Sequence, residues 1–83
     1  MKIFSLHADH VTLGQLLKLT GIIASGGEAK FYLAGSPVLV NGLPEQRRGR
    51  KLRTGDLVEA PNEAPITISG ELLEHDALDS EDA

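Results

Sequence analysis

The most informative stretch of the chain is VLVNGLPEQRRGRKLR, residues 38–53. It opens with the apolar run Val38–Val40, which is typical of a short strand. Asn41 and Gly42 follow, and they favour a tight hairpin turn because both central residues of a type I′ turn need a positive φ. We therefore expect a β-hairpin that continues through Leu43 into the polar residues beyond it.

The second part of this stretch, Arg47 to Arg53, is named the basic segment. It holds five of the eight Lys and Arg residues of the chain. Like charges this close together repel one another, so the segment is expected on the surface, where it favours a polyanionic partner. We predict that it binds RNA; the alternative is a solvated loop without a partner.

Charge is distributed unevenly along the 83 residues, a length that favours one domain with a small core. The formal net charge is −4, but residues 1–70 hold all eight cations against six acidic residues, a net charge of +2. Residues 71–83 hold the other six acidic residues. We expect a domain over residues 1–70 and an acidic, mostly disordered tail over residues 71–83. The tail is expected either to aid solubility or to compete with RNA for the basic segment.

The absence of cysteine and of long apolar runs argues against several classes of protein. Because the chain has no cysteine, disulfides and cysteine-based zinc sites are excluded. No apolar run approaches the length of a membrane span or a signal-peptide core, which favours a cytoplasmic protein without a membrane partner. No oligomeric interface is evident, so a monomer is expected.

Two short helices are expected before the hairpin. Thr12 and Gln15 form a capping-box pattern, and apolar residues then recur at the i, i+3, i+4 spacing of one helix face. Ser25 and Glu28 form a second capping-box pattern, before a helix that is expected to run to about Leu33 or Ala34.

Gly26 and Gly27 occupy the first turn of the second expected helix. Each glycine costs about 1 kcal/mol relative to alanine within a helix, so their presence needs a reason. One reason is that they leave backbone N–H groups bare for a phosphate. The other is close packing of the turn against a neighbouring element, and the sequence leaves both open.

Short strands are expected at both ends of the domain. Residues 2–6 form one of them, residues 57–58 return the chain to the sheet, and residues 66–69 alternate as a last strand that pairs with the N-terminal strand or the hairpin. The predicted fold class is α+β: a small single domain with two short helices packed on a β-hairpin and a short antiparallel sheet.

At this point the residues resemble a known family. The phrases TLGQLLKLTGIIASGGEAKFYL, VLVNG, RRGRKL and GDLVE look like the RNA-binding domain named after ribosomal small-subunit protein four, the S-four domain. The closest resemblance is to the free-standing, single-domain YaaA/YbcJ-like bacterial members, and it covers roughly residues 12–59. It implies the αL motif, with RNA bound by the second helix, its N-terminal turn and the hairpin.

Site residues follow from this resemblance and from the charge of the basic segment. The predicted RNA-binding residues are Ser25, Gly26, Gly27, Lys30, Asn41, Arg47, Arg48, Arg50, Lys51 and Arg53. Many family members carry an arginine or lysine around the turn before the second helix, where this chain has none. For Asn41, a structural role in the turn is an equal alternative to an RNA contact.

The kind of RNA is suggested by the side chains available. Arginine binds phosphate oxygens with two parallel hydrogen bonds, and lysine supplies a point charge. Phe31 and Tyr32 are the only aromatic residues near the predicted site, which is too few for a platform that stacks single-stranded bases. We therefore expect structured RNA, such as ribosomal RNA or tRNA, and possible association with the ribosome or a pre-ribosomal particle.

Two other functions share parts of these patterns. VNGLP and LRTGDLVE also resemble β-grasp sulfur carriers, which act through a C-terminal Gly-Gly. This sequence ends in SEDA and Gly70 stands alone, so a carrier role is not expected. A protein–protein adaptor could use the basic segment against an acidic partner, without the steep salt dependence of polyphosphate binding.

Catalysis has little support. His7, His10 and His75 are scattered over expected loops and the tail, and the carboxylates gather in the tail, where burial could hardly tune a pKa. His7 and His10 flank Asp9, but without a third ligand nearby they are expected to be solvated loop residues. We predict no enzymatic activity, no cofactor and no metal.

Overall fold

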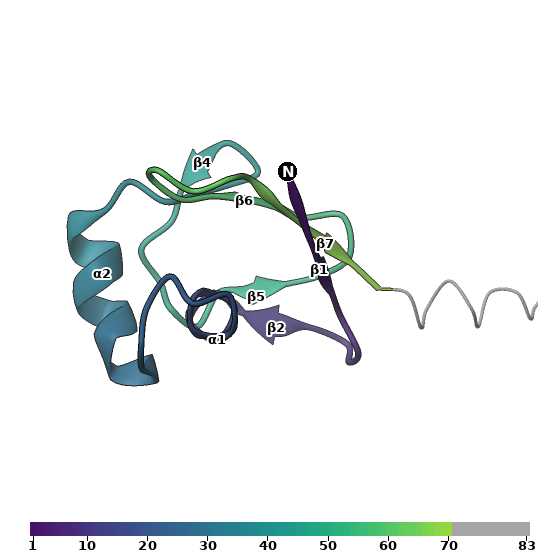
Figure 1. Cartoon of the computed structure of the whole chain (residues 1–83), viewed down its shortest axis with the longest axis horizontal. Helices are drawn as coiled ribbons and strands as arrows, with labels where there is room; N and C mark the ends of the chain where they lie inside the picture. The colour runs from purple at the N-terminus through teal and green to yellow at the C-terminus, as the bar shows by residue number, and fades with distance from the viewer. Residues whose placement is uncertain (71–83) are drawn as a thin grey trace, which may run out of the picture.

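The computed structural model describes residues 1–70; the expected acidic tail, residues 71–83, lies outside the described residues. Short strands and two helices follow one another along the chain (Figure 1). The elements are β1 Lys2–Ser5, β2 Val11–Thr12, α1 Leu13–Leu19, a 3₁₀ turn Gly26–Glu28, α2 Ala29–Gly35, β3 Leu39–Val40, β4 Leu43–Pro44, β5 Lys51–Leu52, β6 Leu57–Glu59 and β7 Ile66–Ser69.

The start of α1 confirms the first capping box. The backbone N–H of Thr12 donates to Gln15 Oε1 at 2.9 Å, and the N–H of Gln15 donates to Thr12 Oγ1 at 3.2 Å. These two bonds occupy donors that the helix itself cannot satisfy. The helix ends before Gly21, whose φ of 81° is left-handed and suits glycine at this position.

The second helix begins with a turn of 3₁₀ helix before it becomes α2. Glu28 reaches back as expected, because its Oε1 accepts the backbone N–H of Ser25 at 3.3 Å and that of Ala24 at 2.6 Å. The N–H of Glu28 donates to the carbonyl of Ser25 at 3.1 Å. Gly26 therefore lies in a tight turn that leads into α2.

The Asn41-Gly42 hairpin is confirmed. Both residues have positive φ, 53° and 84°, as a type I′ turn requires. The turn joins β3 to β4 in antiparallel register, with Val40 opposite Leu43. On its other side β3 pairs antiparallel with β6, which places the hairpin at one edge of the sheet.

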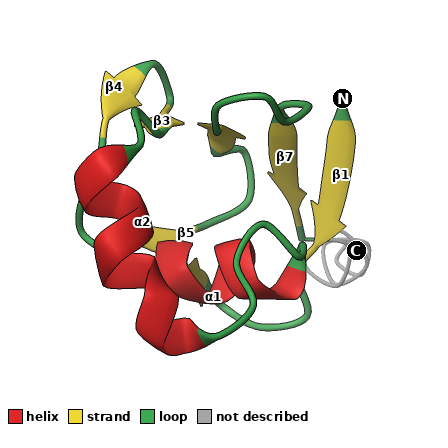
Figure 2. Cartoon of the chain, turned by 60° about the vertical axis from the view of Figure 1, so that its left-hand side comes forward, coloured by secondary structure: helices red, strands yellow, loops and turns green. Residues whose placement is uncertain are grey.

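The main sheet has the strand order β1-β7-β6-β3-β4. β7 pairs antiparallel with β6 and parallel with β1, so the last strand does pair with the N-terminal strand, as expected. This parallel pair makes the sheet mixed. Parallel strands need a long connection, and here nearly all of the described domain lies between β1 and β7. Figures 1 and 2 show β1 and β7 lying side by side.

A second, two-stranded sheet was not expected from the sequence. β2 pairs antiparallel with β5, with Val11 opposite Leu52 and Thr12 opposite Lys51. The basic segment is therefore not a loop throughout, as the sequence suggested, because part of it is a strand. The reason is burial: the side chains of Val11 and Leu52 both lie in the core.

The core lies between the main sheet and the helices. In Figure 1, α1, β2 and β5 lie across from β6 and β7, and α2 closes one side; Figure 2 shows both helices together. The buried apolar residues are Leu6, Val11, Leu13, Leu16, Leu17, Ile23, Ala29, Leu33, Val38, Val40, Leu52, Val58, Ala60, Ile66 and Ile68. Within residues 1–70, neither α-helix is long and apolar enough to cross a membrane.

Candidate nucleic-acid interface

The backbone of the basic segment is attached to the start of α1. The N–H of Leu13 donates to the carbonyl of Arg50 at 2.8 Å, and the N–H of Gly14 donates to the carbonyl of Arg48 at 2.9 Å. The first N–H groups of a helix have no partner within the helix, so the segment satisfies donors that would otherwise need water. Its backbone is consequently held in place.

Gly14 leaves room for this close approach. A Cβ atom at Gly14 would lie 3.3 Å from both the Cβ and the carbonyl oxygen of Arg48, and 3.5 Å from the Cβ of Ala29. The absence of a side chain thus lets α1, α2 and the basic segment meet at one point. Sequence reasoning gave Gly14 no role, although a glycine in the first turn of a capped helix was the available signal.

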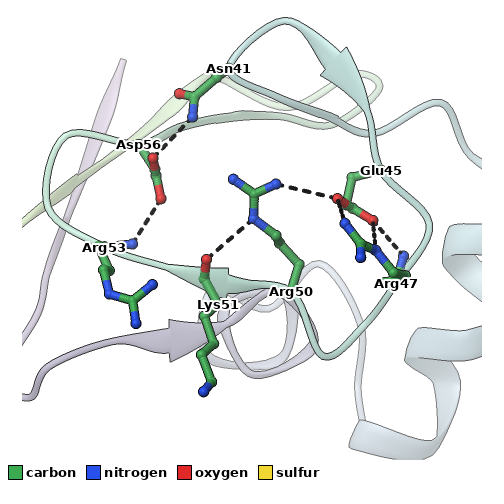
Figure 3. Close-up of polar contacts among 7 residues, drawn as sticks. All are labelled: Asn41, Glu45, Arg47, Arg50, Lys51, Arg53 and Asp56. Carbon is green, nitrogen blue, oxygen red and sulfur yellow. Dashed lines mark hydrogen bonds and ion pairs between the residues drawn. The ribbon is translucent and has the colours of Figure 1, made fainter.

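Glu45 is the buried carboxylate of the site, only 8% exposed, and sequence reasoning missed it. Its Oε2 accepts Arg47 Nε at 2.9 Å and the Arg47 backbone N–H at 3.0 Å. Its Oε1 accepts Arg47 Nη2 at 3.2 Å and Arg50 Nη1 at 3.4 Å. Figure 3 shows both guanidinium groups turned toward this carboxylate. The burial of Glu45 could be recognised only once the position of the hairpin over the core was known.

These contacts change the electrostatics of Glu45. The hydrogen bonds from Arg47, first of all from its side chain, lower the pKa of Glu45 from 4.5 to about 2, although burial acts in the opposite direction. The same pair raises the pKa of Arg47 above its ordinary value. Glu45 is therefore charged at neutral pH and offsets part of the positive charge of the basic segment.

The remaining cations of the basic segment point elsewhere. Arg48, Lys51 and Arg53 are exposed, and in Figure 3 the side chains of Lys51 and Arg53 extend away from Glu45. The backbone N–H of Arg53 donates to Asp56 Oδ2 at 2.8 Å, while its guanidinium lies 4.0 Å from an oxygen of Asp9. An exposed pair at that distance contributes little, so the charge of Arg53 is still available.

Two adjoining grooves cross this surface. One is lined by Thr12, Gly14, Gln15, Lys18, Gly26, Ala29, Arg48 and Gly49. The other is lined by Arg47, Gly49, Arg50, Lys51 and Arg53. Because they share Gly49, the turn before α2, the exposed face of α1 and the basic segment form one continuous surface, which we name the cationic face.

Comparison with known proteins places this fold. A family model described as "S4 domain" matches residues 4–69. The chain belongs to the S4 domain family. The family predicted from the sequence is thus confirmed, and the match extends beyond the hairpin and helices into β1 and β7, the two strands of the parallel pair.

Two relatives of this S4 domain support the same assignment. "Probable ribosome maturation protein RlbA" of Bacillus subtilis (strain 168) is 54% identical over 55 residues, which cover 66% of this chain and 78% of that protein. The solution structure of YbcJ from E. coli matches with a TM-score of 0.63 and 35% identity, over 84% of this chain and 89% of YbcJ. That structure is described as revealing an αL motif involved in RNA binding, and the likeness confirms the predicted fold.

The predicted residues of this S4 domain fall into two groups. The basic segment and Gly26 lie on the cationic face. Ser25 and Gly27 flank Gly26 and are exposed. Lys30 is exposed in the first turn of α2, next to Ala29, which lines the groove. Lys18 was not predicted, but it lines the same groove.

Asn41 belongs to the second group. Its Nδ2 donates to Asp56 Oδ1 at 2.9 Å (Figure 3). Its Oδ1 accepts the backbone N–H of Leu57 at 2.9 Å. Both ends of the amide thus tie the hairpin turn to the start of β6. The structural alternative accounts for Asn41, and an RNA contact there stays a prediction.

Within the described residues, the loop that contains His7, Asp9 and His10 forms no metal site. His10 Nδ1 lies 3.6 Å from Asp9 Oδ2. Within residues 1–70, no three or more His, Cys, Asp or Glu side chains gather closely enough to hold a metal ion.

Proposed function

We propose that this S4 domain is a non-catalytic protein that binds structured RNA through its cationic face. The observation that carries the proposal is the attachment of the basic segment to α1, which presents exposed cations from a fixed backbone beside the turn before α2. Cations carried by a fixed backbone suit an RNA whose phosphates have fixed positions.

The relatives favour ribosomal RNA as the target. RlbA is named as a probable ribosome maturation protein and YbcJ is described as carrying an RNA-binding motif. In this proposal the protein acts as a cytoplasmic monomer, on ribosomal RNA or a pre-ribosomal particle, with tRNA as a second structured target. Ser25, Gly26, Gly27 and Lys30 would contact the backbone at the start of α2.

A salt series with a charge-reversal variant tests the proposal. Arg48, Lys51 and Arg53 are changed together to glutamate, since none of them is bonded to Glu45 through its side chain. Wild type should prefer an RNA hairpin to duplex DNA and to single-stranded RNA. Loss of three phosphate contacts should reduce the slope of log K against log salt by about 2 to 3.

A matched pair of single variants serves as the control. Lys51→Glu and Lys2→Glu change the net charge equally, and both residues are exposed strand lysines, in β5 and β1. We expect Lys51→Glu to weaken RNA binding more than Lys2→Glu. Equal effects, or a wild-type protein with neither RNA preference nor salt slope, would exclude the cationic face and favour an acidic protein partner.

A further inference from the structure

We propose that Glu45 makes the basic segment selective, by fixing the guanidinium groups of Arg47 and Arg50 and offsetting part of their charge. Flexible polyanions then bind weakly, whereas an RNA whose phosphates match the positions of the guanidinium groups binds tightly. This inference rests on the proposed RNA-binding function and adds a residue that itself need not touch RNA.

The geometry of the three residues supports a positioning role. Glu45 is buried, while the side chain of Arg47 is 78% exposed and that of Arg50 is 33% exposed. Arg47 uses Nε and Nη2 on the carboxylate, so its Nη1 edge still faces outward for a phosphate. Arg50 is held at a second point, since its Nε donates to the carbonyl of Lys51 at 3.3 Å.

The charges of the same residues support weak binding to flexible polyanions. Arg47, Arg50 and Glu45 together carry a net charge of +1, although the two arginines alone would carry +2. Binding to a flexible polyanion depends mainly on how many counterions the protein displaces, and this number falls with the local charge. A rigid RNA gains instead from cations that need no ordering when it binds.

Glu45→Gln tests the inference because glutamine keeps the size of the side chain and removes its charge. Wild type and variant are titrated with an RNA hairpin and with oligo(U) of the same length, over a range of salt concentrations. The local charge rises by one, so for oligo(U) the salt slope should steepen by about 0.7. Near 0.1 M salt the affinity for oligo(U) should therefore rise by up to about fivefold, because the inverse of this salt concentration, about 10, raised to the power of about 0.7 is about 5. The preference for the hairpin should fall.

Glu63→Gln is the matched control. Glu63 is an exposed acid in the loop between β6 and β7, and no ion pair within residues 1–70 involves it. It should leave the oligo(U) slope unchanged. If Glu45→Gln weakened both probes equally without changing either slope, Glu45 would have only a structural role and the inference would be wrong.

A second comparison avoids any folding defect in the Glu45 variant. Arg47→Gln and Lys51→Gln each remove one exposed cation, but only Arg47 is paired with Glu45. The oligo(U) slope should change less for Arg47→Gln than for Lys51→Gln, and equal changes would contradict the inference. If wild type binds neither RNA, the proposed function fails, but the inference about Glu45 can still be tested. Elution from heparin in a salt gradient should then show a smaller effect for Arg47→Gln than for Lys51→Gln.

Discussion

Replacing Gly14 with alanine tests how closely the basic segment packs on α1. The new Cβ would lie 3.3 Å from the Cβ and the carbonyl oxygen of Arg48, closer than most such atoms approach. The carbonyl cannot retreat without lengthening its 2.9 Å bond from the Gly14 N–H. The methyl group therefore strains the contact that holds the basic segment.

The expected magnitude follows from two opposing effects. Overpacking of a tight contact costs about 1 to 3 kcal/mol, and alanine in a helix gains about 1 kcal/mol over glycine. We expect Gly14→Ala to lower the free energy of unfolding by about 1 kcal/mol, which lowers Tm by about 4 to 8 °C in a domain of this size. Gly35→Ala is the control: a Cβ at Gly35 meets no atom within 4 Å, so helix propensity should raise the stability by about 0.5 to 1 kcal/mol.

Urea unfolding followed by circular dichroism measures both variants, and RNA titration follows on the folded proteins. The reasoning predicts opposite signs for Gly14→Ala and Gly35→Ala, with weaker RNA binding for Gly14→Ala alone. If Gly14→Ala stabilised the protein as much as Gly35→Ala does, the close approach to Arg48 would not constrain the fold.

Three further predictions concern stability. Because Glu45 has a pKa lowered from 4.5 to about 2, its contribution is complete above about pH 4.5 and is lost as the pH falls toward 2. Because solvent screens its exposed partner Arg47, the Glu45 carboxylate should contribute only about 1 to 2 kcal/mol to the free energy of unfolding. The difference in this free energy between wild type and Glu45→Gln should therefore be smaller in urea titrations at about pH 3 than at about pH 6. A difference that stays constant would contradict the prediction. Asn41→Ala should lower the free energy of unfolding by about 2 kcal/mol, because it loses the bond to Asp56 and strains a positive φ. Asn41→Gly loses the same bond without the strain and should cost about 1 kcal/mol; equal losses in urea unfolding would mean that the positive φ has no effect on stability. Thr12→Ala should cost about 1 kcal/mol by removing the cap that Gln15 completes, and an unchanged urea midpoint would show that the cap contributes nothing.

Features set by neighbouring residues were predictable from the sequence. The hairpin turn depends on Asn41 and Gly42 alone, since few residues accept positive φ at two successive positions. The cap of α1 likewise needs only Thr12 and Gln15. The family followed because these local patterns occur in a particular order.

Features that join distant parts of the chain were not predictable. Glu45 looks like any exposed acid beside arginines, and its burial depends on how the hairpin lies over the core. The strand character of Lys51 depends on Thr12, which is far away in the sequence. The contact of Gly14 with Arg48 has the same origin. A single sequence contains local propensities but not these distant pairings.

The parallel pairing of β1 with β7 has a consequence for synthesis of the chain. Among the described strands, β1 is made first and pairs only with β7, which is made last. β1 therefore has no strand partner until residues 66–69 have left the ribosome. Such long-range pairings slow folding, because the chain between them must first be closed into a loop. A nascent chain that stopped before Ile66 would leave the apolar side of β1, with Phe4, open to chaperones or to aggregation.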